Sequence, residues 1–330
     1  MKFRATSICT IGLFVLALTA LFVYRVTSAG SAYAAFPGSN GRITFSRFNP
    51  AIGDFTLFTA NPDGSHESQL TTFPGFVSDW SPDGSKIAFD FPSDATSANI
   101  ATINPDGSGF VQLTHEQNDA SVEPAWSPDG TRMAVARPDG DHPHGIFIID
   151  ATTGAILSQV TANPYGWFDG EPRWSPDGQW IAFDRLKKGS IGGIYGRIDL
   201  GAVFIVRSDG TGLRQLTSGW GTQPANPDWS PDGSKIVFTS AGAFPAPVSI
   251  YTINPDGSGL TPVIKNLVNG RFENPRWSPD GTKLIFQGSP DLGHIRRGLW
   301  TVDADGSNLT EIISGPPAPQ DAAWGTHPQQ

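Results

Sequence analysis

Apolar and polar residues alternate with a period of two in many short runs along the chain. One such run is Arg42-Ile43-Thr44-Phe45, and further strand-like runs such as Ile250-Tyr251-Thr252-Ile253 and Leu213-Arg214-Gln215-Leu216-Thr217 recur along the chain. These runs are bounded by Gly, Pro, Asp and Asn, which favour tight turns. Beyond the first 30 residues, no stretch keeps the spacing of an amphipathic helix. The pattern therefore predicts an all-β protein built from many short strands.

Two turn motifs recur in alternation. Trp-Ser-Pro-Asp-Gly occurs five times, and a sixth copy is split between the two ends of the chain. The split copy has its tryptophan at Trp324 and its continuation at Gly41 to Phe45. The second motif, Asn-Pro-Asp-Gly or a shorter variant, separates the copies of the first. Complete copies of the first begin at Trp80, Trp126, Trp174, Trp229 and Trp277, and the second begins at Asn61, Asn104, Thr152, Ser208, Asn254 and Ala304.

Each repeat unit predicts four strands, which we name A to D in chain order. Strand A ends at the tryptophan, the Pro-Asp-Gly turn leads into strand B, and the second turn joins strands C and D. Six such units over residues 36–330 predict a six-bladed β-propeller of four-stranded antiparallel blades. The split repeat predicts that N- and C-terminal strands share one blade and close the ring. Closure hides edge strands that an open array would expose.

The combination of motifs resembles a known repeat family. Trp-Ser-Pro-Asp-Gly is followed by Lys86-Ile87-Ala88-Phe89 in one unit, and Ile-Tyr-Thr-Ile runs into Asn254-Pro255-Asp256-Gly257 in another. With Leu-x-Gln-Leu-Thr after the second turn, this is similar to the TolB-like propeller family over residues 36–330. The resemblance implies a propeller that binds a protein partner in the cell envelope. It extends to the propeller part only, since a small α/β domain precedes the propeller in TolB.

The N-terminus carries the features of an export signal. Lys2 and Arg4 precede an uncharged stretch over residues 5–24, and Ala32-Tyr33-Ala34 has the form of a cleavage site. Residues 1–35 are expected to be a signal peptide or an uncleaved membrane anchor, since residues 5–24 could just span a bilayer. A buried helix is the third alternative, but an all-β chain offers it no partner. The first two place residues 36–330 in the periplasm or outside the cell.

The loop lengths predict which face of the propeller binds. The tryptophan and the strand B residue are nine apart in every complete unit, as in Trp80 and Phe89. The stretch between strands B and C varies, so length variation falls on the opposite face, where binding sites are expected. The longest such loop runs from Asp184 to Gly201. It carries four cationic side chains and is either a partner contact or a solvated insertion: Arg185, Lys187, Lys188 and Arg197.

A polar residue lies three positions before the tryptophan in five of the six units. These are Glu123, Glu171, Asn226, Asn274 and Asp321, and only Val77 breaks the pattern. Because strand A is innermost, we expect these residues to ring the channel mouth on the variable face. There they would hold a cation, a cationic group or another small ligand. The alternative is that they bind loop amides at the start of the strand.

The tryptophans themselves are expected to be wedges between blades. The turn aspartates Asp83, Asp129 and Asp177 are expected to stabilise their turns.

No complete catalytic constellation is present in the sequence. Gly-x-Ser-x-Gly, a phosphate-binding loop and a dinucleotide fingerprint are all missing. His115, His142, His144 and His294 fall in loops of the variable face, but at unmatched positions in three units. The sequence therefore predicts neither metal nor cofactor. The lone cysteine, Cys9, excludes an intramolecular disulfide.

These patterns are compatible with three functions. The net charge of −9 argues against nucleic acid as a partner. We expect a monomeric, exported scaffold that binds a protein or small ligand on the variable face and meets a membrane only through its N-terminal segment. The second hypothesis is a metal-dependent carbohydrate lyase or hydrolase, because propeller-fold pectate-type lyases use a His cluster. The third is a structural envelope protein without a small ligand.

Overall fold

We analysed a computed structural model of the chain. It describes residues 38–326 except 95, 118, 138–143, 165, 188–200, 218–223, 242–247, 265–269 and 291–296. The expected N-terminal segment therefore lies outside the described residues. Within the described ranges every regular element is a β-strand. They contain no helix long and apolar enough to cross a membrane.

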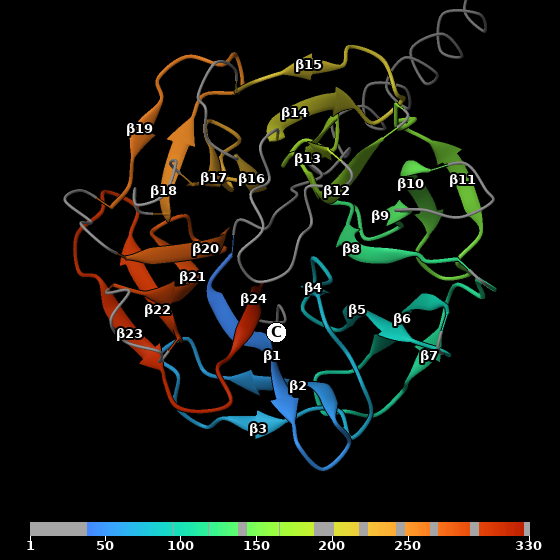
Figure 1. The fold of residues 1–330 in the computed structure, drawn as a ribbon, viewed down its shortest axis with the longest axis vertical. Coiled ribbons are helices and arrows are strands. Elements are labelled where there is room, and N and C mark those ends of the chain that lie inside the picture. The colour runs from blue at the N-terminus through green and yellow to red at the C-terminus, as the bar shows by residue number, and fades with distance from the viewer. Residues whose placement is uncertain are drawn as a thin grey trace, which may run out of the picture. The chain divides into compact units, whose positions relative to one another are not determined.

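The strands form five sheets that radiate from a common axis, and all but one of their strand pairings are antiparallel (Figure 1). Four of the sheets have four strands each. They are β24 (Gln320–Thr326), β1 (Asn40–Asn49), β2 (Asp54–Ala60) and β3 (Ser68–Gln69); β4 (Ser78–Trp80), β5 (Ile87–Pro92), β6 (Ala98–Ile103) and β7 (Val111–Gln112); β8 (Val122–Trp126), β9 (Arg132–Arg137), β10 (Gly145–Asp150) and β11 (Ile156–Gln159); and β12 (Trp167–Trp174), β13 (Trp180–Lys187), β14 (Gly201–Arg207) and β15 (Arg214–Gln215).

The fifth sheet has eight strands, which corrects the prediction of six separate four-stranded blades. Its first half is β16 (Ala225–Trp229), β17 (Ile236–Ala241), β18 (Val248–Ile253) and β19 (Thr261–Pro262). Its second half is β20 (Arg271–Trp277), β21 (Lys283–Ser289), β22 (Gly298–Asp303) and β23 (Thr310–Ile313). The halves join because Val248 of β18 pairs in parallel with Arg271 of β20. The all-β propeller is confirmed, with four separate blades and one double sheet.

The two ends of the described chain meet in one sheet, as the split repeat predicts. Strand β24 lies antiparallel to β1, and Trp324 is the register partner of Ile43. Figure 1 shows the red C-terminal strand beside the blue first strand close to the centre. The ring is thus closed by main-chain pairing between distant parts of the sequence.

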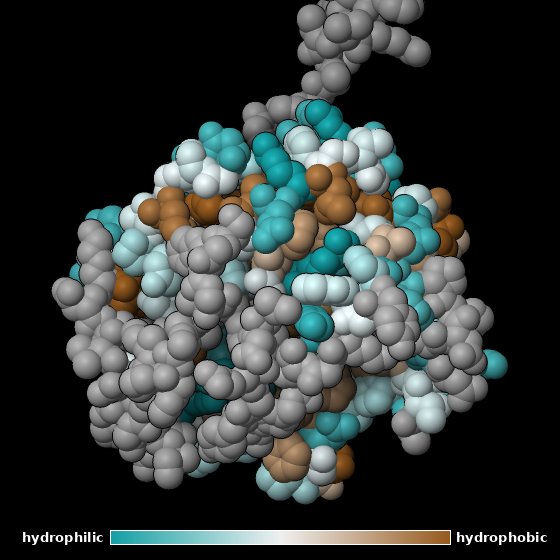
Figure 2. All heavy atoms as spheres, turned by 45° about the horizontal axis from the view of Figure 1, so that its top comes forward, coloured by the Kyte–Doolittle hydropathy of each residue, from teal (hydrophilic) through white to brown (hydrophobic). Residues whose placement is uncertain are grey.

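The hydrophobic core lies between neighbouring sheets. Each cluster of buried side chains combines residues from two adjacent sheets or half-sheets, and each repeat tryptophan packs in one of them. Trp174, for example, packs against Ala134, Ile146 and Ile148 of the preceding blade. The predicted wedge role agrees with this packing. Exposed large apolar residues such as Leu213 and Leu260 are spread around the outer strands, and Figure 2 shows apolar side chains among polar ones at the rim.

In four blades, side chains seal the end of the ladder between strands C and D. Thr114 accepts a hydrogen bond through Oγ1 from the Ile100 N–H at 2.9 Å, and Gln112 donates through Nε2 to the Thr114 carbonyl at 2.8 Å. The same pair of bonds recurs at Gln69 and Thr71, Gln159 and Thr161, and Gln215 and Thr217. Strands β3, β7 and β15 are only two residues long. The Gln-x-Thr motif thus replaces further ladder bonds.

The connections divide between two faces. The turns after the tryptophans and the turns between strands C and D share one face, which we call the turn face. The remaining connections share the other, which we call the loop face. Strand A runs from the loop face to the turn face, so residues at its start lie at the loop-face mouth of the axis.

Candidate functional site

The five predicted mouth residues share an unusual backbone conformation. Glu123, Glu171, Asn226, Asn274 and Asp321 all have positive φ, between 49° and 55°. The register between strands A and B shifts across all five of these positions, as between Gly170 and Arg173. A bulge with left-handed φ favours Asn and Asp, whose short polar side chains tolerate it. Part of the polar pattern therefore has a backbone cause.

The backbone amides at these bulges are bound by side chains of the preceding blade. Such bonds satisfy donors on the inner strands, which have no further strand to pair with. The Glu171 N–H donates to Glu123 Oε2 at 2.7 Å, and the Asn226 N–H donates to Asp184 Oδ2 at 3.0 Å. Thr239 Oγ1 and Gln287 Oε1 accept the corresponding bonds from the N–H groups of Asn274 and Asp321 at 3.2 and 2.7 Å.

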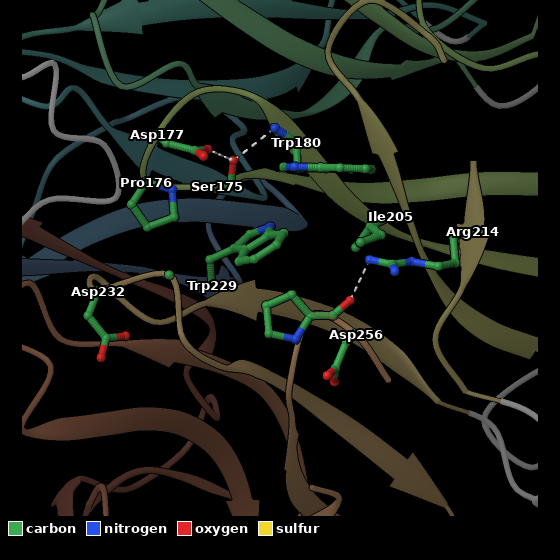
Figure 3. A pocket seen from close by; sticks show the side chains of 11 residues that line it. Ser175, Pro176, Asp177, Trp180, Ile205, Arg214, Trp229, Asp232 and Asp256 are labelled. Carbon is green, nitrogen blue, oxygen red and sulfur yellow. Dashed lines mark hydrogen bonds between the residues drawn. The ribbon is translucent and has the colours of Figure 1, made fainter. Parts of the chain in front are cut away.

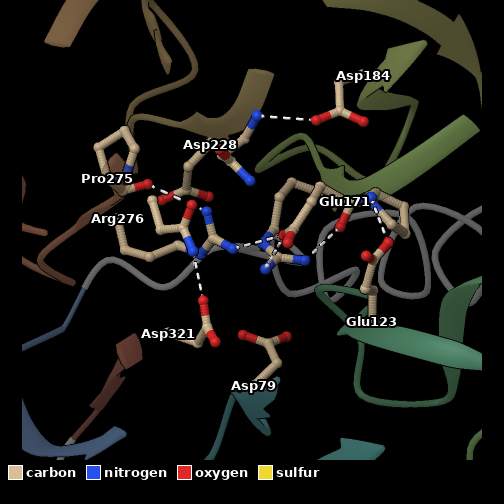
Figure 4. Close-up of polar contacts among 12 residues, drawn as sticks. Asp79, Glu123, Glu171, Asp184, Asp228, Pro275, Arg276 and Asp321 are labelled. Atoms are coloured by element: carbon tan, nitrogen blue, oxygen red, sulfur yellow. Dashed lines mark hydrogen bonds and ion pairs between the residues drawn. The ribbon is translucent and has the colours of Figure 1, made fainter. Parts of the chain in front are cut away.

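A buried ion-pair network fills the axis beside the mouth (Figure 4). Glu171 Oε2 accepts hydrogen bonds from Nη2 of Arg276 at 2.8 Å and Nη2 of Arg173 at 3.2 Å. Both guanidiniums are buried, and each also donates to a nearby proline carbonyl. One mouth carboxylate thus bridges two cations, which ties blades that are far apart in sequence.

Two further carboxylates join this network nearer the turn face. Asp79 and Asp228 each accept the backbone N–H of the next repeat tryptophan, Trp126 and Trp277, at 2.8 Å. With Arg173 and Arg276 they line an axial cavity of about 30 Å³, large enough for a water but not for a side chain. Burial raises the pKa of Asp79, and it raises the pKa of Asp228 to about 6.

Asp90 and Asp184 bring unbalanced negative charge to the mouth. They occupy the same repeat position, one residue after the strand B phenylalanine, and both are buried. Burial raises the pKa of each to about 7. In each, Oδ1 is buried without a hydrogen-bond partner in the part of the chain that the structure describes. A cationic group placed here would supply the hydrogen-bond donors that these oxygens lack.

Other mouth carboxylates reinforce this acidic character. Burial and then repulsion from Glu171 raise the pKa of Glu123 well above its ordinary value. Burial and the charge of Glu171 also raise the pKa of Asp321 to about 6, and Asp321 Oδ1 accepts a hydrogen bond from Asn274 Nδ2. The mouth therefore concentrates carboxylates whose ionisation is suppressed by burial and by each other.

Sequence reasoning missed Asp90, Asp184, Arg173 and Arg276. The two arginines directly precede a repeat tryptophan in the tetrapeptide Pro-Arg-Trp-Ser, a departure that the sequence shows twice. The two aspartates interrupt an apolar strand after Ile-Ala-Phe. A charge in an otherwise buried strand was the signal that could have found them.

The predicted cationic loop begins later than expected. Strand β13 continues to Lys187, so Arg185 is a strand residue rather than a loop residue. Its Nε lies 2.5 Å from Oδ1 of the buried Asp169, and its guanidinium packs over the Phe204 ring at 5.1 Å. The cation is thereby bound within its own blade. Lys187 is exposed, while Lys188 and Arg197 lie outside the described residues.

Three of the six histidines fall outside the described ranges, whereas the turn aspartates form the bonds predicted for them. His142, His294 and His327 lie outside the described residues, and the described residues contain no group of three His, Cys, Asp or Glu that could hold a metal. Asp129 binds Ser127 Oγ at 2.7 Å and the Thr131 N–H at 3.0 Å, as expected for a turn residue. Asp83 and Asp177 make the same bonds in their turns.

Comparisons with known proteins agree with this architecture. Among curated relatives, a peptidase of uncharacterised function from Bacillus subtilis, YuxL, is 31% identical over 129 residues, covering 36% of this chain and 17% of its own length. A TolB homologue from Chlorobium luteolum is 32% identical over 136 residues, covering 41% of this chain and 27% of its own length. The chain thus spans well under a third of either relative.

Solved structures share the fold at low sequence identity. TolB from Acinetobacter baumannii superposes with a TM-score of 0.69 at 19% identity, over 92% of this chain and 70% of that one. An oligogalacturonate lyase in complex with manganese gives 0.56 at 17% identity, over 84% and 75%. The family model of the TolB β-propeller domain matches residues 40–328. The chain therefore belongs to the TolB β-propeller domain family.

Proposed function

We propose that the protein is an exported propeller scaffold that binds a protein partner at the loop-face mouth. The observation that carries this proposal is the pair of buried, half-satisfied carboxylates, Asp90 and Asp184, beside the other acidic groups of the mouth. A lysine or arginine side chain of the partner would satisfy the free oxygens and offset the repulsion among the carboxylates. The five predicted mouth residues frame this site.

Three finer expectations belong to the same proposal. The halves of the eight-stranded sheet act as two blades, because only one parallel register pair joins them, and the ring then has six. Residues 1–35 direct export or anchor the chain, and residues 36–330 form the propeller as a monomer. The location is periplasmic or extracellular, and membership of the TolB family supports a partner in the cell envelope.

The test uses Asp90→Asn together with Asp184→Asn. Immobilised protein captures envelope proteins at low salt, and the affinity of the captured partner is then measured by calorimetry at pH 8. The double variant keeps side-chain size but removes the two charges, and affinity should fall roughly tenfold or more. Wild-type affinity should also weaken from pH 8 to pH 6, because both aspartates become protonated below a pKa of about 7.

Asp79→Asn is the matched control. It neutralises a buried carboxylate that lines the axial cavity nearer the turn face. Its partner affinity should stay at the wild-type value. Equal affinity of the double variant and wild type at low salt would exclude the mouth as the site, and Lys187 with the following loop would then be the next candidate.

A metal-dependent carbohydrate-active enzyme is the second candidate. Its support is the shared fold with the manganese-bound oligogalacturonate lyase, which at 17% identity shows the fold alone. Incubation with oligogalacturonate and Mn²⁺ distinguishes the two, because a lyase produces an unsaturated product that absorbs in the ultraviolet. Turnover abolished by chelation would favour the enzyme over the scaffold.

A further inference from the structure

A pocket of about 420 Å³ opens on the turn face, away from the mouth (Figure 3). It lies between the blade β12–β15 and the half-sheet that begins with β16. Trp180, Ile205 and Arg214 line it from one side, and Trp229, Asp232 and Asp256 line it from the other. A volume of this size accommodates a side chain or a small ligand.

The repeat itself shows what is unusual at this junction. Six residues after the repeat tryptophan, the chain has a cation in five units, namely Arg42 of the split unit, Lys86, Arg132, Lys235 and Lys283. In the sixth unit the residue is Trp180. The lysines bind an Asn or Asp at the start of the second turn, as Lys86 Nζ binds Asn104 Oδ1 at 2.7 Å and Lys235 Nζ binds Asn254 Oδ1 at 2.6 Å.

Two further departures accompany Trp180. Arg207 stands where Asn104 and Asn254 stand in their units, and it packs over the Trp180 ring at 4.7 Å. Arg214 occupies the strand D position held elsewhere by Ser, Thr or Val, and it lies 5.8 Å from the same ring. These contacts hold Trp180 within its own blade. Three changes in one blade have thus replaced the usual cation by an aromatic ring.

The preceding junction shows what can fill the equivalent space. Arg132 holds the position that corresponds to Trp180, and its guanidinium lies over the ring of Trp174, the wedge tryptophan of the next blade, at 5.0 Å. Its Nη2 also lies 3.5 Å from Asp129 Oδ2. The counterparts of Trp174 and Asp129 at the pocket are Trp229 and Asp177, and both line it. The aromatic ring and the carboxylate are present, whereas Trp180 stands at the position that the cation Arg132 holds at the preceding junction.

The charges around the pocket favour a cation. Asp177, Asp232 and Asp256 line it, and none forms an ion pair within the described ranges. They accept hydrogen bonds from Ser hydroxyls and backbone N–H groups of their own turns. The lining cation, Arg214, donates through Nη2 to the Pro255 carbonyl at 2.7 Å.

We propose that this pocket binds a guanidinium group presented by a partner polypeptide, in the place that Arg132 fills at the preceding junction. The pocket is a second site, on the face opposite the mouth, and it does not depend on the function proposed above. Carboxylates hold the edges of the guanidinium, and the indole ring of Trp229 contributes cation–π attraction.

The first experiment titrates the protein with an acetylated, amidated pentapeptide that has one arginine between glycines. Calorimetry or amide chemical shifts report binding. A citrulline peptide of the same shape lacks the charge and should bind at least roughly tenfold more weakly. Free arginine amide distinguishes a small-molecule site from a polypeptide site, because the peptide should bind more tightly if backbone groups contribute. Equal binding of the arginine and citrulline peptides overturns the proposal, and so does the absence of binding at about 10 mM peptide.

Two variants locate the binding site. Trp180→Arg combined with Arg207→Asn places a guanidinium at the position that Arg132 holds at the preceding junction, fills the pocket from within the chain and should abolish binding. Asp256→Asn should weaken binding roughly two- to fivefold, as expected for a solvent-exposed ion pair. Asp106→Asn is its control, because Asp106 makes the same turn bonds to Ser108 that Asp256 makes to Ser258. Equal loss in the two Asn variants, or full binding by a folded double variant, also overturns the proposal.

Discussion

Replacement of Trp324 by alanine tests how strongly the ring depends on its closing strand. Trp324 is 5% exposed and packs with Ile43, Phe45, Ile285 and Leu299, so it joins β1 and β24 to the neighbouring half-sheet. Removing a buried tryptophan side chain typically costs about 3–5 kcal/mol of unfolding free energy. That is a large part of the roughly 5–15 kcal/mol available to a domain. Truncation at residue 319 should cost more, since it also removes the ladder of β24 with β1.

The assay is urea denaturation followed by far-ultraviolet circular dichroism, which does not depend on the tryptophan removed. Leu157→Ala is the control, because Leu157 is 53% exposed and its loss should change the free energy by less than about 0.5 kcal/mol. Trp126→Ala removes a comparable wedge inside the chain without touching the closure. Only the truncated protein should also associate with increasing concentration, because it exposes the edge of β1. An unchanged unfolding free energy for Trp324→Ala would refute the closing role of this residue.

Three further predictions concern the axis and the turns. Glu171→Gln should lower the unfolding free energy, measured in urea, by roughly 3 kcal/mol, since Arg173 and Arg276 stay buried without their carboxylate. Glu67→Gln is the control, because Glu67 pairs with Arg47 at a partly exposed position. An equally small effect of the two substitutions would contradict the network. The raised pKa values of Asp90 and Asp184, about 7 against an ordinary 3.8, mean that the folded state binds more protons than the unfolded state between these values. Unfolding free energy should therefore decline from pH 4 to pH 7, and Asp184→Asn should make that decline shallower; an identical pH profile in the variant would contradict the assignment. Gly130→Ala should cost about 1 kcal/mol because Gly130 has a φ of 67°, and a thermal melt that shows no loss would contradict a strained turn.

The repeat made most of the fold predictable, because its signals are local. A Trp-Ser-Pro-Asp-Gly turn fixes where strand A ends and strand B begins, and the split copy at Trp324 indicates the pairing of β24 with β1. The eight-stranded sheet was not predictable. It depends on one parallel register pair, Val248 with Arg271, that brings two blades close enough for a ladder bond. No sequence motif near either residue indicates that the two blades approach each other this closely.

The candidate site was predictable in part. The recurring polar position before each tryptophan indicated the mouth, although its positive φ gives this pattern a backbone cause as well. Asp90 and Asp184 escaped notice because the same position holds Ser46, Ala136, Thr239 and Gln287 in other blades. A site assembled from different residue types in different blades has no period for sequence reasoning to detect. The balance of charges at this site becomes visible only when the folded strands bring these side chains together.

The Gln-x-Thr seals on the outer strands have a consequence for life in a crowded compartment. A sheet grows when a neighbour's strand finds free N–H and C=O groups along its edge. In four blades the edge strand stops after two to four residues, and a threonine hydroxyl and a glutamine amide occupy groups that would come next. The edge strand of each of these four blades therefore offers another copy of the chain only two to four residues to pair with. Neighbouring propellers can meet rim to rim at high concentration without templating a shared sheet.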